Sequence, residues 1–462
     1  MAYPALRPSV EKDSGNEPVI ADSVSAEWPN SPECQRATMK QRARRLSTPV
    51  NFVWMASGNA IYSACSLVMV AVIAKLGLPG DVGMYSLGIA VSQPVIFLSQ
   101  LNLTSILAAD VTGRYRVGTY FSLRLWMSIL AMLGVLVYTS IAIHDRVTQA
   151  VVLVTMAGAL FDSLSEVEYG LFRVRERMNL VSISLIVRGV LSLAGLLAAM
   201  LIWHNIIAAV VASALASVVT TCFLDTFMLK GIAEGEVSPF FWNWGASVHF
   251  ADQMKLAKIA LPMGLVMMLA SLTINIPRYL VDGSLGHVQL GIFSAMASFA
   301  TIGRIVVLAM GQSTTPNLAR AFARDPRHDF AKKTAILMGL CALVGVLGVA
   351  IVAAAGPLLL KTAFTKEYAE RNTLFLAVIA ASALGYLGNM VGIALTAARV
   401  FKMQLPHLLS IVLVTAVAGF VLIPRMGLMG AAWAIGIASM WQFMSGAALL
   451  AWRIRRPTQA EW

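Results

Sequence analysis

The chain has 462 residues, of which 58% are hydrophobic and 13% are charged, and its mean hydropathy is +0.74. This composition lies far from that of soluble proteins and favours a protein embedded in a membrane. The net charge of +12 would suit a nucleic-acid-binding protein, but the basic residues lie between apolar stretches and form no single patch. We therefore expect the membrane as a partner and no nucleic acid.

Twelve apolar windows follow one another along the chain, each close to the 20 or so residues that a transmembrane helix needs. The windows lie near 50–74, 83–107, 121–143, 147–169, 179–202, 206–229, 258–280, 288–311, 334–355, 373–396, 407–423 and 429–452. The sequence therefore predicts an all-α integral membrane protein with about twelve transmembrane helices.

The first 46 residues differ from the rest, because they are polar and end in a basic segment that runs from Arg36 to Arg45. We expect a disordered cytoplasmic tail there and a short second tail at 454–462. A cleavable signal peptide would instead place its basic residues and a short apolar core at the extreme N-terminus.

The distribution of basic residues predicts how the chain is oriented. With both termini in the cytoplasm, 23 lysines and arginines fall in inside segments and 7 in outside segments. The seven outside residues are Lys75, Arg146, Arg278, Lys361, Lys366, Arg371 and Arg425. The positive-inside rule therefore predicts a multi-pass protein of the cell inner (plasma) membrane with N- and C-termini in the cytoplasm. The connection at 356–372 fits this rule least well.

The longest interior connection divides the spans six and six. Residues 231–257 carry an aromatic cluster and are expected to form a cytoplasmic interfacial linker between a bundle at 47–230 and a bundle at 258–453. The segment 83–86, Gly-Met-Tyr-Ser, matches the segment 291–294, Gly-Ile-Phe-Ser, at the start of the second span of each half. We therefore expect a parallel repeat with a central cavity between the two bundles.

Ionisable residues deep in a span cost roughly 3 kcal/mol or more unless they face protein or water, so each is a candidate site residue. The deepest fixed charges are Arg188, Arg278 and Arg304. Because guanidinium groups match phosphate oxygens, these residues favour an anionic ligand. Two alternatives stay open: Arg188 could pair with an acid of a neighbouring helix, and Arg278 and Arg304 could extend to the membrane surface.

Several uncharged and acidic residues extend this set. Asn275 continues a polar stripe inward from Arg278, and Asn59 and Gln93 lie in the first two spans, where they could also bond neighbouring helices. Asp162 and Glu166 could couple transport to an ion gradient or form a surface ion-pair cluster with nearby arginines. Asp110 is a candidate for a cytoplasmic gate.

No catalytic, metal or cofactor site is expected. The six histidines and four cysteines are scattered without metal-ligand spacing. A membrane-embedded polysaccharide polymerase or acyltransferase would need catalytic groups on a sizeable outside loop, and the longest, 356–372, offers only Glu367 and Glu370 as paired acids. We therefore predict that the protein is not an enzyme. Gly388 and Gly392 form a helix-packing motif that is expected to act within one chain, so the protein is expected to function as a monomer.

Four stretches resemble the polysaccharide transporter family, the O-antigen and exopolysaccharide flippases of the superfamily that also contains multidrug extruders and the lipid II flippase. The most informative is Asn275-Ile276-Pro277-Arg278-Tyr279, followed by 285–286 and 290–293. The others comprise 51–54 with 74–77 and 82–88, 162–165 with 169–171 and 175–178, and 423–424 with 427–432. One departure lies at Thr104 and Ser105, where the family leads us to expect a basic residue.

This resemblance implies a two-bundle fold that moves undecaprenyl-diphosphate-linked oligosaccharide from the inner to the outer leaflet by alternating access. The lipid-linked diphosphate would be the anion, with Arg278 in the family's Pro-Arg-aromatic position. A drug or cation antiporter and a lipid II flippase of the same fold are the alternatives, although an antiporter would be expected to use deep acids rather than bases. A polysaccharide polymerase stays open as a partner.

Overall fold

The computed structural model describes residues 48–109, 115, 117–230 and 250–455, and these residues form helices without any β-strand. Twelve helical stretches are long and apolar enough to cross a membrane. The predicted number of spans is therefore confirmed. The tails expected at 1–46 and beyond Arg455, most of the linker and Asp110 lie outside the described residues.

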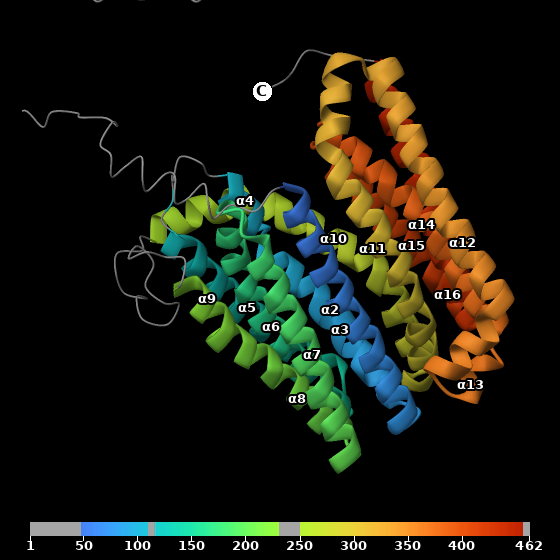
Figure 1. Ribbon diagram of the computed structural model, residues 1–462. Coiled ribbons are helices and arrows are strands. Elements are labelled where there is room, and N and C mark those ends of the chain that lie inside the picture. Colours follow the sequence, from blue (N-terminus) through green and yellow to red (C-terminus); the bar gives the residue numbers. More distant parts are fainter. Residues whose placement is uncertain (1–47, 110–114, 116, 231–249, 456–462) are drawn as a thin grey trace, which may run out of the picture. The chain divides into compact units, whose positions relative to one another are not determined.

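Six spans come from the first half of the chain, as Figure 1 shows in blue to green. They are built from α2 (Thr48–Leu76), α3 (Asp81–Gln100) with the short α4 (Leu103–Ala109), α5 (Val117–Ala142), α6 (Arg146–Val174), α7 (Met178–Trp203), and α8 (Ile206–Val219) continued by the π-helical η1 (Thr220–Asp225) and α9 (Thr226–Lys230).

Six further spans follow in yellow to red (Figure 1). They are α10 (Phe250–Leu285), α11 (His287–Arg324), the π-helical η2 (Pro326–Phe330) with α12 (Ala331–Ala363), α14 (Asn372–Ala397), α15 (Gln404–Met426) and α16 (Leu428–Arg455), with the short α13 (Lys366–Ala369) between α12 and α14.

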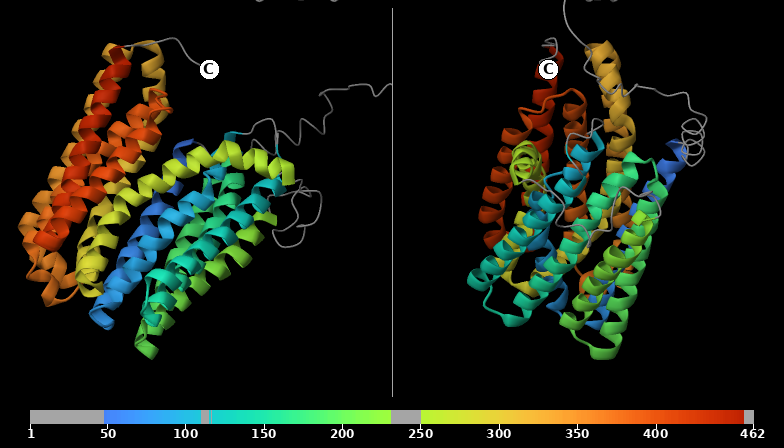
Figure 2. Two further views of the ribbon diagram at one scale, coloured as in Figure 1. Left: turned by 180° about the vertical axis from the view of Figure 1, so that it is seen from behind. Right: turned by 90° about the vertical axis from the view of Figure 1, so that its left-hand side faces the viewer.

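Three helices of the second half are longer than the apolar windows predicted. The helices α10, α11 and α12 have 36, 38 and 33 residues, whereas about 20 suffice to cross a bilayer. Residues 250–257, which the sequence analysis placed in the linker, are the first turns of α10. Figure 2 shows α10 bending as it passes from the first half to the second, and its two internal prolines, Pro262 and Pro277, supply the physical cause of bending.

The two halves use the same helix pairs. In the first half α2 packs on α7, α3 on α6, α5 on α6, and α8 on both α6 and α7. The corresponding helices of the second half pair identically: α10 with α15, α11 with α14, α12 with α14, and α16 with both α14 and α15. The halves meet chiefly where α3 packs against α10 and α11.

The buried apolar residues show where the halves join. We call the side on which the described chain begins and ends the terminal side, and the opposite side the loop side. On the loop side one core cluster includes residues of both halves, such as Val82, Met200, Phe293 and Ile423. On the terminal side the second half has its own cluster around Phe330 and Met390, and the first turns of α10 pack through Leu256 and Ala260 into a cluster of the first half. The halves therefore share a core on the loop side, whereas on the terminal side the main core of the second half is separate and α10 reaches across to the first half.

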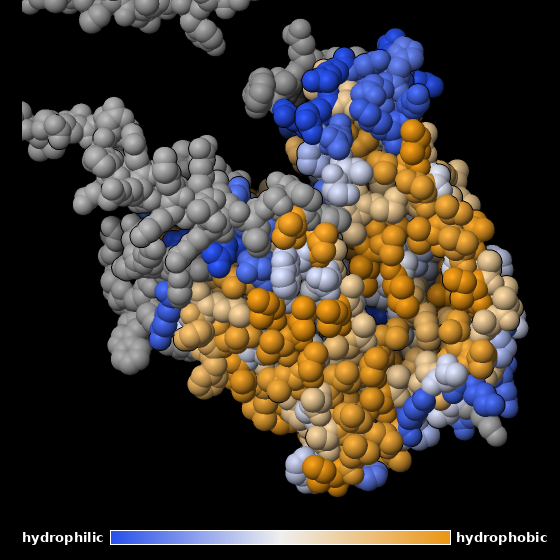
Figure 3. Space-filling view, viewed as in Figure 1, coloured by the Kyte–Doolittle hydropathy of each residue, from blue (hydrophilic) through white to orange (hydrophobic). Residues whose placement is uncertain are grey.

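The surface matches a membrane location. On the face shown in Figure 3, hydrophobic side chains cover the middle of the helices, and hydrophilic side chains gather at their two ends. Large apolar side chains such as Trp126, Phe223 and Phe420 are more than 60% exposed. Burying this surface in lipid removes it from water, which stabilises the inserted protein.

Candidate functional site

Two arginines from neighbouring helices of the second half lie close to each other. Arg278 of α10 and Arg304 of α11 are both half-buried, and the positive charge of Arg304 repels that of Arg278. Among the described residues, neither guanidinium lies within 4.0 Å of a carboxylate. A pair of cations without a protein anion is a favourable place for an anionic ligand.

Asn275 holds the first of these arginines in place. Its Oδ1 accepts a hydrogen bond from Arg278 Nη1 at 3.1 Å, while its Nδ2 donates to the carbonyl and hydroxyl oxygens of Ser271. The Asn275 side chain is completely buried. It therefore orients Arg278 from one helical turn away and has no surface left for a ligand.

Arg304 has an aromatic neighbour instead of an acid. Its guanidinium lies near the hydroxyl of Tyr386 on α14, and that hydroxyl donates to the carbonyl oxygen of Ala300 at 2.6 Å. Gly303, next to Arg304, allows this approach, because a Cβ there would lie 2.4 Å from the Tyr386 hydroxyl. The site thus combines residues of α10, α11 and α14.

Arg188 behaves differently from the other two arginines. It is 2% exposed inside the first half, where Nη1 lies 3.2 Å from Asp162 and Nη2 lies 3.0 Å from Asp225. Nη2 also donates to the hydroxyls of Ser165 and Thr221. The structure thus places Arg188 in the buried ion pair that the sequence analysis left open as an alternative, and it does not bring Arg188 together with Arg278 and Arg304.

The Arg188 cluster contains more acids than bases. Glu168 is 1% exposed and close to Arg188 and Asp225, and its Oε2 has no hydrogen-bond partner among the described residues. Asp162, by contrast, keeps 31% of its side chain exposed and lies beside the hydroxyl of Tyr62. Three carboxylates around one guanidinium can accept a proton or a small cation, because like charges this close cannot all stay ionised without a counter-ion.

The other predicted residues are more scattered. Asn59 and Gln93 are exposed, and the Asn59 amide donates to the carbonyl of Met55. The exposure of Gln93 is unusual for its helix, because α3 belongs to the most buried of the twelve spans. Glu166 lies 3.7 Å from Arg173, and both side chains are about a third exposed. That pair corresponds to the surface ion pair that the sequence analysis left open as an alternative.

A chain of polar groups links the two halves on the loop side. The His287 ring, at the start of α11, places Nδ1 2.6 Å from Asp282 Oδ1 and Nε2 3.3 Å from Thr148 Oγ1. Thr148, in the first turn of α6, in turn donates to Asp145 Oδ2 at 2.6 Å. In addition, Lys75 of α2 donates to the carbonyl of Thr362 in α12. Sequence analysis missed this link, because His287 is 139 residues away from Thr148 in the chain and none of the linked residues lies deep in an apolar window.

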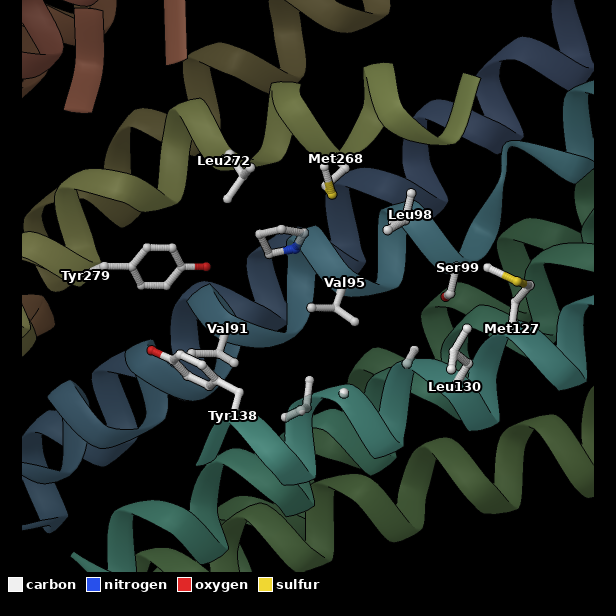
Figure 4. Close-up of a pocket in the computed structure, with 14 residues that line it drawn as sticks. Val91, Val95, Leu98, Ser99, Met127, Leu130, Tyr138, Met268, Leu272 and Tyr279 are labelled. Carbon is white, nitrogen blue, oxygen red and sulfur yellow. The ribbon is translucent and has the colours of Figure 1, made fainter. Parts of the chain in front are cut away.

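An apolar pocket of about 560 Å³ lies between α3, α5 and α10. Figure 4 shows Val95, Leu98, Met127, Met268 and Leu272 around it, with the rings of Tyr138 and Tyr279 at one end. None of the site residues predicted from the sequence lines this pocket. It therefore has the character of a hydrocarbon-facing groove rather than of a polar ligand site.

Comparison with known proteins agrees with the fold. No family model matches the chain. A capsular polysaccharide biosynthesis protein, CapF, of Staphylococcus aureus is 24% identical over 401 residues, which cover 86% of this chain and 97% of that protein.

Solved structures with the same fold are transporters. An inward-facing multidrug resistance transporter of the MATE family of the MOP superfamily is 13% identical, covers 91% of this chain and 99% of its own, and has a TM-score of 0.63. The outward-facing form gives 16% identity, coverage of 87% and 94%, and a TM-score of 0.61. A MOP superfamily transporter from Pyrococcus furiosus, described as having a binding pocket of reverse polarity that suggests a different function, gives 16% identity, coverage of 88% and 95%, and a TM-score of 0.60. The chain thus has the fold of the MOP superfamily transporters.

Proposed function

We infer that this chain is a polysaccharide transporter of the MOP superfamily, and we propose that it moves undecaprenyl-diphosphate-linked oligosaccharide units from the inner to the outer leaflet. Its MOP transporter fold and its similarity to a capsular polysaccharide biosynthesis protein over most of both chains support this proposal. The observation that carries it is the arginine pair of Arg278 and Arg304, which has no acid partner among the described residues.

The arginine pair suits a diphosphate. A guanidinium presents parallel N–H donors that match phosphate oxygens, and two guanidiniums can neutralise the two charges of a diphosphate diester. Without a ligand the arginines repel each other, so an anion between them relieves that repulsion as well as supplying hydrogen bonds. Exposed Gln93 and Asn59 are proposed to contact the sugars, and Asn275 to orient Arg278.

The proposed direction of transport depends on which side of the chain faces the cytoplasm. We propose that the terminal side is cytoplasmic and lies at the inner membrane, because it carries most of the basic residues between spans. On that side the main core of the second half is separate from the first half, whereas on the loop side one core cluster includes residues of both halves. The structure then represents a conformation that receives substrate from the cytoplasmic leaflet.

We further propose that the Arg188 cluster couples transport to an ion. Asp162 is the partly exposed member, so it can exchange a proton or a sodium ion, while Arg188 and the buried acids set its electrostatic environment. In this proposal Arg188 belongs to the ion-coupling cluster and does not contact the lipid diphosphate.

The proposal is tested in the host organism. The gene is deleted, and wild type, Arg278→Ala, Arg278→Lys and Arg304→Ala are compared at equal membrane abundance for surface polysaccharide and for lipid-linked repeat units. We expect the deletion to accumulate lipid-linked units inside, and wild type to relieve this accumulation. Arg278→Ala should restore little polysaccharide, while Arg278→Lys, which keeps the charge but not the fork of donors, should restore an intermediate amount.

Arg173→Ala is the matched control, because it removes an arginine whose ion pair with Glu166 is partly exposed. It should behave as wild type. Normal polysaccharide and normal lipid-linked units in a deletion strain without a second homologue would overturn the proposed function.

A drug or cation antiporter is the second candidate. The excess of carboxylates around Arg188 favours it, since such a cluster can bind a cationic drug as well as a proton. Export of cationic dyes that is lost in Asp162→Asn and retained in Arg278→Ala would support this function over the first.

A further inference from the structure

The loop-side link between the halves requires a doubly protonated histidine. Thr148 has one hydroxyl proton, and the short 2.6 Å contact with Asp145 Oδ2 uses it. The hydroxyl oxygen can then only accept from His287, so His287 Nε2 carries a proton. An ionised carboxylate also only accepts, so the 2.6 Å contact with Asp282 requires a proton on Nδ1. Both ring nitrogens donate, and His287 is an imidazolium between two carboxylates.

The same residue lies where the backbones of the two halves come into direct contact. A Cβ added to Gly83 of α3 would lie 1.8 Å from the carbonyl oxygen of His287, so the backbones of α3 and α11 touch at this point. Thr148 is completely buried, and Asp282 is mostly buried, which strengthens the attraction between these charges. The link therefore joins α6 and α3 of the first half to α10 and α11 of the second.

We propose that charged His287 holds the loop side of the transporter closed, and that loss of its second proton favours opening. This role of His287 belongs to the closed conformation and does not depend on which ligand is carried. A neutral ring can donate from only one nitrogen, so deprotonation breaks the bond either to Asp282 or to Thr148 and removes the attraction to both acids.

Other charged groups around the ring do not replace this role. On α3, the buried carboxylate of Asp81 accepts from the backbone N–H of Leu78. The hydroxyl of Tyr138 on α5 lies near Asp282 and is neutral at physiological pH. Arg371, at the start of α14, donates to Gln289. His287 therefore sets the direction of the pH dependence. The closed state is favoured when the ring is charged and is weakened as pH rises.

The test measures the distance across the loop side in the full-length protein. Spin labels are placed at Leu78→Cys and Val288→Cys, whose native side chains are 70% and 44% exposed, in a background without the native cysteines. We expect one short distance at about pH 5.5 and a growing population of longer distances toward about pH 8.5. His287→Gln should raise the longer population about tenfold or more at the lower pH and abolish its pH dependence.

His204→Gln serves as the matched control, because His204 is an exposed loop-side histidine at the end of α7. Its distances should follow those of wild type at each pH. Thr148→Val removes only the bridging hydroxyl and should shift the distances in the same direction as His287→Gln. It keeps the test usable if His287→Gln fails to fold. Identical distance distributions at both pH values in wild type, or an unchanged distribution in the Thr148 and His287 variants, would overturn the inference.

Discussion

Gly83 of α3 and Gly291 of α11 lie against each other at the loop-side crossing of the two halves. A Cβ added to Gly291 would lie 3.0 Å from the backbone nitrogen of Gly83. These glycines begin the two hairpin segments that sequence comparison matched. In a parallel repeat, matching residues can touch each other only next to the symmetry axis between the halves. The contact and the identical helix pairing in each half therefore favour the repeat.

The first prediction concerns this crossing. Gly83→Ala places a methyl group against the backbone carbonyl of His287. Backbone atoms cannot move out of the way as the end of a side chain could. We expect α3 and α11 to separate on the loop side, with a loss of about 1–3 kcal/mol in stability, measured as the thermal midpoint in detergent. Gly339→Ala on α12 is the control, since no atom lies within 4 Å of the added Cβ. Equal midpoints for the two variants would contradict the close approach.

The spans could be predicted from sequence because their signal is local. An apolar run of about 20 residues is visible in the sequence without any knowledge of its neighbours, and all twelve predicted windows correspond to helices. The ends of α10, α11 and α12 could not be predicted in the same way. Residues such as Asn317 and Arg320 are polar, and only the structure shows that the helix continues through them.

The site was less accessible to prediction than the spans. The stripe of Ser271, Asn275 and Arg278 follows helical spacing and was found, because all three residues lie on one face of one helix. The pairing of Arg188 with Asp162 and Asp225 depends on how three helices pack. No spacing within one helix contains that information, so sequence alone favoured a ligand contact for Arg188 and left the buried ion pair as the alternative.

The second prediction separates the roles of Asn275 and Arg278. Asn275→Ala removes the acceptor that orients Arg278, whereas Asn275→Asp places a carboxylate 3 Å or so from the guanidinium and neutralises it. We therefore expect the aspartate variant to transport less than the alanine variant at equal abundance. Transport of the labelled lipid-linked substrate into the outer leaflet of proteoliposomes measures the difference. If the two variants transport equally, the charge of Arg278 is not what the substrate needs.

The third prediction concerns the buried ion pairs of Arg188. Arg188→Leu leaves Asp162 and Asp225 without their counter-ion inside the first half. The expected loss of stability is about 3–5 kcal/mol, because an unpaired charge is then buried. Adding Asp225→Asn should recover part of this loss, since it removes one of the stranded charges. Protein yield and thermal midpoint in detergent report both effects.

The matched control for this prediction is Arg173→Leu. Its ion pair with Glu166 is 3.7 Å long and about a third exposed on each side, so the expected loss is below about 1 kcal/mol. A similar midpoint for Arg173→Leu and Arg188→Leu would mean that the Arg188 cluster is not a structural ion pair, and would return Arg188 to the candidates for ligand contact.

The fourth prediction is a pH dependence at the start of α6. Asp145 caps this helix by accepting from the side chain and backbone N–H of Thr148, and these hydrogen bonds lower the pKa of its carboxyl below the usual range. Because the pKa is lower in the folded state, the ionised cap stabilises the fold above the unfolded-state pKa, and this contribution is lost as pH falls through the folded-state pKa.

Asp145→Ala should cost about 1 kcal/mol near pH 6, where His287 stays charged. The gap between wild type and Asp145→Ala in thermal midpoint should therefore narrow between about pH 6 and about pH 3. Asp145→Asn keeps an acceptor without a titrating charge, so it should retain part of the stability and lose this pH dependence. A gap of constant size across the range would show that Asp145 acts through its shape and not through its charge.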